Sequence, residues 1–141
     1  MKIAKYGLPL AIIAGLGYSF YQVGFSTGVN ATAFWILSNG ILAFLGAVIA
    51  RSHLITWIVS FIASPLTSLN PALAAGMVAS YCEGKLYPPK VEELESIAYI
   101  ENYRELWGNQ VGRIILTFIF VNIGSGAALF ISAGYIASLR T

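Results

Sequence analysis

The sequence predicts an all-α integral membrane protein that forms a single domain over residues 1–141. It would have three spanning helices, a broken or re-entrant helical hairpin and an amphipathic interfacial helix. Hydrophobic residues make up 57% of the chain and charged residues 10%, whereas about a quarter of a soluble domain is charged. Charges are also absent between Lys5 and Arg51, between Arg51 and Glu83, and between Arg113 and Arg140. Such stretches are long enough to cross about 30 Å of hydrocarbon.

Composition also narrows the function classes. There is one cysteine, one histidine (His53) and no aspartate, so the chain cannot build a disulfide framework or a cysteine-rich metal site. A net charge of +2 with scattered basic residues does not indicate nucleic-acid binding. No nucleophile with a partner base is apparent, and His53 beside Arg51 is interpreted as an interfacial residue. The sequence therefore predicts a non-enzymatic chain without cofactor or metal.

The first predicted span covers residues 6–25. A cleavable signal peptide is the rival interpretation, but Tyr18, Phe20 and Tyr21 stand where small residues would mark a cleavage site. The second predicted span covers residues 32–50 and ends before Arg51 at an interface.

A polar break with two prolines, at residues 64–71, interrupts the next apolar run. Pro65 and Pro71 each lack a backbone donor, so we expect one helix to stop and another to start there. The flanking pieces, 54–63 and 72–83, are each too short to span. They form either a crossing helix with an unwound centre or a re-entrant hairpin. The hairpin places every basic residue except Arg140 on one side, whereas the crossing divides them evenly, so charge bias favours the hairpin.

Residues 84–113 hold most of the charge and form the interfacial segment. Apolar residues recur there mostly at steps of three, which predicts an amphipathic helical face seated on the membrane surface: Val91, Leu94, Ile97, Ile100, Tyr103, Leu106 and Trp107. The last predicted span covers residues 114–136.

Polar residues inside the apolar segments are the candidates for a site. We expect them to line a polar cavity or to form hydrogen bonds between helices: Asn39, Ser64, Thr67, Ser68, Asn70, Asn122 and Ser125. Small residues spaced four apart, such as Ala75 with Ala79 and Gly124 with Ala128, predict close helix packing. Because three spans and a hairpin leave little interior in which to bury the break, we also expect a homo-oligomer.

Several ordered motifs give the chain a resemblance to a known family. They are Trp-Ile-Leu-Ser-Asn-Gly at 35–40, Ala-Ser-Pro-Leu-Thr-Ser-Leu-Asn-Pro at 63–71, Pro-Lys-Val-Glu-Glu-Leu at 89–94, Leu-Trp-Gly-Asn at 106–109 and Asn-Ile-Gly-Ser at 122–125. Together they resemble the carboxy-terminal membrane domain of the TraB, or pheromone-shutdown-related, family. The resemblance implies the cell membrane of a prokaryote and an association with peptide-pheromone shutdown. It also implies a TIKI-like soluble partner domain with Gly-x-x-His motifs, which this sequence does not contain. The chain is thus either an excised domain or a stand-alone version.

Two functional classes follow. The first is a module that anchors and oligomerises a TraB-family protein in the lipid bilayer. The second is a module that binds or transports a small solute or ion at the break. Because no charge lies within the predicted spans, the first is favoured.

Overall fold

The computed structural model describes residues 2–22, 24–70 and 73–138, without the side chains of residues 2–6, 8, 9 and 19. Every regular element in these residues is helical, which confirms the all-α part of the predicted class. In chain order they are α1 (Lys2–Gln22), α2 (Phe25–Ile49), α3 (Leu54–Ser68), α4 (Ala75–Leu86), α5 (Val91–Ser96), the 3₁₀ turns η1 (Ile97–Tyr99) and η2 (Tyr103–Trp107), and α6 (Gln110–Ser138).

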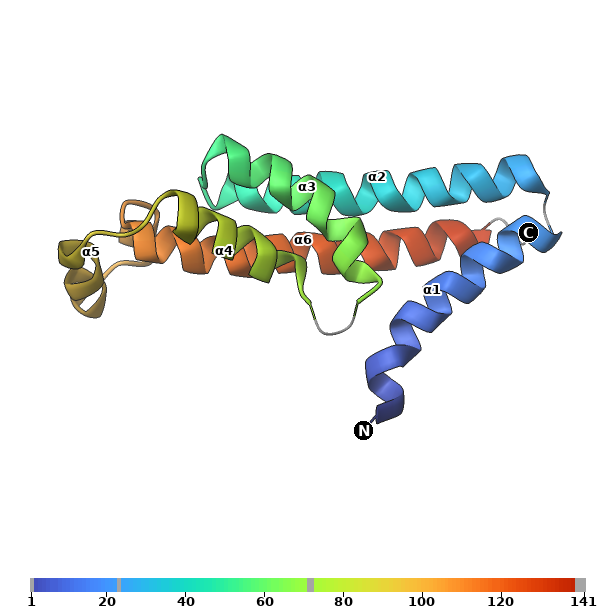
Figure 1. The fold of residues 1–141 in the computed structure, drawn as a ribbon, viewed down its shortest axis with the longest axis horizontal. Coiled ribbons are helices and arrows are strands. Elements are labelled where there is room, and N and C mark those ends of the chain that lie inside the picture. The colour runs from blue at the N-terminus through green and yellow to red at the C-terminus, as the bar shows by residue number, and fades with distance from the viewer. Residues whose placement is uncertain (1, 23, 71–72, 139–141) are drawn as a thin grey trace.

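Helices α2 and α6 lie side by side and antiparallel along the length of the molecule (Figure 1). They contain 25 and 29 residues, and a stretch of 18 residues within each has a mean hydropathy of 1.9 and 2.2, so both are long and apolar enough to cross a membrane. At 1.5 Å per residue they extend about 37 and 43 Å. Among the described residues only these two helices meet that test, and a third crossing by α1 stays a prediction. Toward its amino end α1 diverges from the bundle (Figure 1).

Glycines set the close contact between α2 and α6. A methyl group added to Gly46 of α2 would collide with the backbone of Phe120 in α6, and one added to Gly124 of α6 would collide with the carbonyl of Leu42 in α2. Each of the two helices thus contributes one glycine to the interface between them. Their missing side chains let the backbones touch, as small residues do in membrane helix pairs.

Helices α3 and α4 form an antiparallel hairpin against one half of the α2–α6 pair (Figure 1). Its open end lies where α2 ends and α6 begins, and its tip lies near the middle of the bundle. Gly76 of α4 sits directly against the backbone of Phe118 and the side chain of Asn122. The core at this crossing is made mostly of alanines, and consists of Ala43, Ala47, Ala75, Ala79 and Val121.

The prediction that Pro65 ends a helix is wrong, since α3 continues through it to Ser68. A proline this close to the end of a helix removes one hydrogen bond, and the helix needs only one more turn. Hydroxyls reinforce that turn: Thr67 Oγ1 donates to the Ala63 carbonyl at 2.9 Å and Ser68 Oγ to the Ser64 carbonyl at 2.8 Å. The first helix therefore ends at Ser68 rather than before Ser64, the next begins at Ala75, and Pro71 lies outside the described residues.

The interfacial segment also differs from its prediction. Instead of one amphipathic helix it contains α5 and two 3₁₀ turns. Steps of three residues match the 3₁₀ helix, which has 3.0 residues per turn, better than the α-helix with 3.6. This match covers only η1 and η2, since Val91 and Leu94 lie in the α-helix α5.

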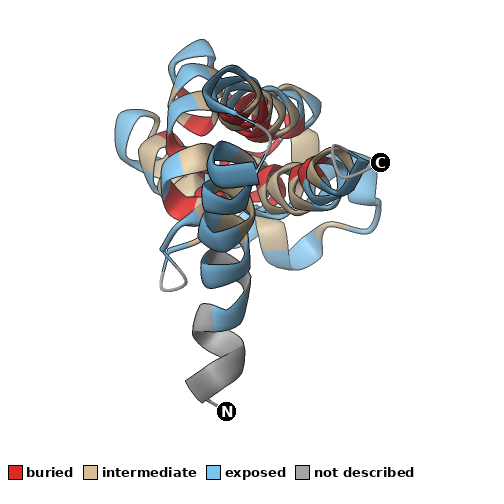
Figure 2. Cartoon of the chain, turned by 90° about the vertical axis from the view of Figure 1, so that its right-hand side faces the viewer, coloured by how far each residue is buried: buried red, intermediate tan, exposed pale blue. Residues whose placement is uncertain are grey.

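Burial is inverted relative to a water-soluble protein. The fully buried side chains larger than serine are Glu83, Val121, Asn39, Thr56 and Thr117, four of which are polar. Large apolar side chains instead face outward along α2, α3 and α6, including Leu37, Ile41, Leu45, Ile58, Ile62, Ile119 and Ile123. Figure 2 shows the buried residues gathered on the inner sides of the helices.

Candidate functional site

The predicted polar residues pair across helices at several separate places along the hairpin. Ser68 Oγ of α3 shares its one hydroxyl proton between Asn39 Oδ1 of α2, at 3.0 Å, and the Ser64 carbonyl, and Asn39 Nδ2 donates to the Trp35 carbonyl at 2.9 Å. Ser64 Oγ of α3 lies 3.0 Å from Ser125 Oγ of α6. Each pair ties α3 to a different neighbour.

Asn122, Thr67 and Asn70 take part in hydrogen bonds that involve backbone groups. Asn122 Oδ1 accepts a 2.9 Å hydrogen bond from the amide of Gly76, one of the amides at the start of α4 that have no partner within the helix. Thr67 turns back onto its own helix. The amide of Asn70 donates to the Thr67 carbonyl at 2.9 Å, so Asn70 belongs to the turn that ends α3. Of the predicted residues, five therefore form contacts between helices: Asn39, Ser64, Ser68, Asn122 and Ser125.

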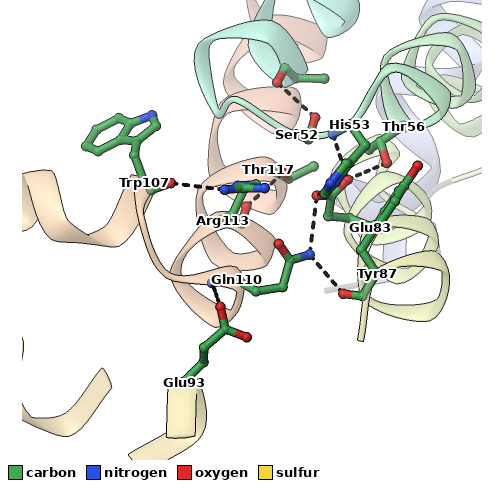
Figure 3. Close-up of polar contacts among 11 residues, drawn as sticks. Ser52, His53, Thr56, Glu83, Tyr87, Glu93, Trp107, Gln110, Arg113 and Thr117 are labelled. Atoms are coloured by element: carbon green, nitrogen blue, oxygen red, sulfur yellow. Dashed lines mark hydrogen bonds and ion pairs between the residues drawn. The ribbon is translucent and has the colours of Figure 1, made fainter. Parts of the chain in front are cut away.

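The most concentrated polar site is elsewhere, at the open end of the hairpin, around Glu83 (Figure 3). Glu83 lies on the last turns of α4 and is completely buried. Its Oε2 accepts from the His53 amide at 3.0 Å and from Thr56 Oγ1 at 2.5 Å. Its Oε1 lies 2.6 Å from His53 Nδ1 and 3.4 Å from Gln110 Nε2. Each oxygen thus has two partners, which matches the capacity of a carboxylate.

A second layer of contacts holds these donors in place. The His53 ring stacks on Tyr87 with ring centroids 3.3 Å apart and an interplanar angle of 9°. The side-chain Nε2 of Gln110 also donates to the Tyr87 carbonyl at 2.9 Å. The backbone amide of Gln110 donates to Glu93 Oε1 at 3.2 Å. The cluster therefore joins the start of α3, the end of α4 and the start of α6.

The chemistry available at this cluster is narrow. Because the carboxylate only accepts, the hydrogen bond at 2.6 Å requires a proton on His53 Nδ1 or a protonated Glu83. Thr56 and Glu83 are both fully buried, whereas His53 and Tyr87 are partly exposed. Within the described residues no group of three or more histidine, cysteine or acidic side chains could hold a metal ion. The geometry fits a structural role, in which the hydrogen bonds of Glu83 hold α3, α4 and α6 together.

Glu83, which ends one of the stretches without charges in the sequence, was not predicted to be buried. The signal was present in the spacing, because Gly76, Ala79 and Glu83 follow at steps of three and four and so share one helix face. Gly76 and Ala79 are small because that face packs against α6. A carboxylate on the same face must enter the interior.

Comparison with known proteins places the chain in a family. The sequence profile of the C-terminal domain of TraB family proteins matches residues 1–140. An uncharacterized protein, MJ1365 of Methanocaldococcus jannaschii, is 32% identical over 137 residues, which are 94% of this chain and 34% of that protein. The chain thus spans about a third of the length of this curated relative. No solved structure matches significantly. The chain therefore belongs to the TraB family and corresponds to its C-terminal domain.

Proposed function

We propose that this chain is a membrane-anchoring and oligomerisation domain of a TraB-family protein, without catalytic activity of its own. The observation that supports it best is the inverted burial, with isoleucine, leucine and phenylalanine outside and Asn39, Thr56 and Glu83 inside. Lipid tails cover an apolar surface at no cost, whereas buried polar groups need partners within the protein. In the full-length protein the domain would hold a soluble domain at the bilayer, and any link to peptide-pheromone shutdown would belong to that whole protein.

The hairpin fits the same proposal as a re-entrant element. In α2 and α6 the chain would cross the bilayer, while α3 and α4 would enter and leave from the side where α2 ends. The hydrogen bonds of Asn39, Ser64 and Asn122 supply partners for the hairpin at membrane depth. This use of the polar groups favours an anchor over a solute or ion site at the break.

Extraction and flux together test the anchor. After expression, the chain should stay in the membrane pellet through washes with alkaline carbonate and be released only by detergent. Reconstituted into liposomes, it should carry no ion or solute flux above that of empty liposomes. Release by carbonate would contradict the anchor. Flux that disappears in Asn39→Ala and Ser68→Ala would replace it with the transport alternative.

Self-association is a separate part of the proposal. Gly46, Gly76 and Gly124 are used between helices of one chain, so an oligomer would form through other faces. The outward face of α1 is one such surface, since Leu10, Ile13 and Tyr21 are exposed there. The mass of the detergent-solubilised particle measures the copy number. A single copy would remove oligomerisation from the proposal and leave the anchor intact.

A further inference from the structure

A groove with two unpaired arginines opens at the end of the bundle where α2 stops. It has a volume of about 530 Å³ and is lined by Ile49, Arg51, Tyr103, Arg104 and Trp107. The volume lies within the range of small-ligand sites, about 300–1,000 Å³. Two positive groups therefore face one open space of ligand size.

The walls of the groove are held in place. Trp107 Nε1 donates to the Ile49 carbonyl at 2.8 Å, which ties η2 to the end of α2. The guanidinium of Arg113 donates to the Trp107 carbonyl at 3.4 Å from α6. Tryptophan and tyrosine are the residues that collect where hydrocarbon meets headgroups. The groove thus has the composition of a membrane interface and a fixed frame.

The charges in the groove have no protein counter-ion. Of the described residues, only His53 and Glu83 form an ion pair within 4 Å, so neither Arg51 nor Arg104 is neutralised by a carboxylate. Glu105, which is next to Arg104 in the chain, lines a different groove with Glu93 and Asn109. The two guanidinium groups remain available for an anion.

Arg51 is also held in an unfavourable backbone conformation. Its φ of +56° lies in the left-handed region, which glycine and asparagine adopt more readily than arginine does. The conformation is that of a Schellman turn at the end of a helix, in which the Arg51 amide donates to the Val48 carbonyl at 2.9 Å and the Ser52 backbone amide to the Ala47 carbonyl at 3.2 Å. Ser52 Oγ also donates to the Ala47 carbonyl at 2.9 Å. These hydrogen bonds fix the point at which the Arg51 side chain leaves the end of α2.

We propose that this groove binds the phosphate of an anionic lipid headgroup, with Arg51 and Arg104 as its two cationic ligands. Arginine presents its donors in a planar fork that fits phosphate oxygens. Ile49 lies beside the groove on the membrane side and is exposed, so it can contact the upper part of an acyl chain. The inference rests on the membrane placement proposed above.

The test uses the full chain in detergent, titrated with short-chain phosphatidic acid or phosphatidylcholine and followed by native mass spectrometry. Phosphatidic acid should bind in preference. One arginine near an anionic surface contributes about 1 kcal/mol, so Arg51→Asn and Arg104→Gln should each weaken binding about five-fold and the double variant about 30-fold. Arg51→Asn suits the left-handed backbone, so it should not impair folding. Lys85→Gln, an exposed charge outside the groove, is the control.

Three results would overturn the proposal. They are equal binding of the two lipids, an equal loss in the Lys85→Gln control, and displacement of the lipid by millimolar inorganic phosphate, which would make free phosphate the ligand. Carbonate extraction of the double variant separates this site from the anchor. The variant should stay in the membrane even when its lipid binding is lost.

Discussion

At the scale of single residues, the buried Glu83 carboxylate is the most consequential side chain. Its partners come from two other parts of the chain, His53 and Thr56 from the start of α3 and Gln110 from the start of α6. Removing one member of a buried charged pair leaves the others without a partner, at a cost of about 3–5 kcal/mol. A large part of the free energy of unfolding thus depends on the few hydrogen bonds of this cluster.

Glu83→Ala should therefore destabilise the protein by about 3 kcal/mol or more, because it leaves four donors facing a cavity. Unfolding of the detergent-solubilised protein measures the loss. Glu92→Ala, an exposed carboxylate on α5, is the matched control and should change stability little. Equal stability of the two variants would show that the hydrogen bonds of Glu83 do not stabilise the fold.

Glu93 gives a prediction on pH. The Lys90 amide donates to Glu93 Oε2 at 2.8 Å and the Gln110 amide to Oε1 at 3.2 Å. The hydrogen bond from Lys90 in particular holds the pKa of Glu93 below its ordinary value of 4.5. A lowered pKa in the folded state means that the carboxylate stabilises the fold above that ordinary value, and that this stabilisation is lost as the pH falls through the lower, folded-state pKa.

Amide hydrogen exchange across α5 and the start of α6 measures this effect. Protection should be greater in the wild type than in Glu93→Gln at roughly pH 6, and the difference should vanish toward roughly pH 3. A difference that does not depend on pH would contradict the assignment. Glu92→Gln serves as a control for the loss of an exposed charge.

At the scale of elements, glycine contacts position the helices. Gly124 meets the Leu42 carbonyl of α2, whereas Gly126, one half-turn along the same helix, has open space around it. The pair offers a comparison in which the substitution and the helix are the same and only the surroundings differ.

Gly124→Ala should destabilise the α2–α6 pair by about 1–3 kcal/mol through overpacking. Gly126→Ala should be neutral or stabilising by about 0.5–1 kcal/mol, since alanine favours the helix. Thermal unfolding in detergent distinguishes them. Equal loss in both variants would indicate that the glycines matter for something other than the close approach.

The presence of most helices and of their small-residue faces could be predicted from the sequence, because both are local patterns. The position of the break could not. Pro65 favours a helix end, but Thr67 and Ser68 return hydroxyl hydrogen bonds to the last turn and extend α3 past it. The partners of Glu83 were also beyond reach, since His53 and Gln110 lie 30 and 27 residues away and only the packing of α3, α4 and α6 brings them together.

At the scale of the whole molecule, topology can be tested by labelling. Single cysteines at Asn30, Lys85 and Lys90, in a Cys82→Ser background, are exposed to an impermeant thiol reagent in sealed vesicles. With a re-entrant hairpin, Lys85 and Lys90 should react from the side opposite to Asn30. If α3 and α4 together crossed the bilayer, all three would react from one side. Permeabilised vesicles, in which every position should react, control for local accessibility.

The re-entrant hairpin proposed above would also set an order for biosynthesis. Its hydrogen bonds to α6 need residues that are translated only after α4 is complete, and they join Gly76 to Asn122, Ser64 to Ser125 and Glu83 to Gln110. Until α6 emerges from the ribosome, α3 and α4 are each too short to cross the bilayer and lack these partners. In the re-entrant arrangement proposed above, insertion of the hairpin would therefore be completed only after α6 has been synthesised.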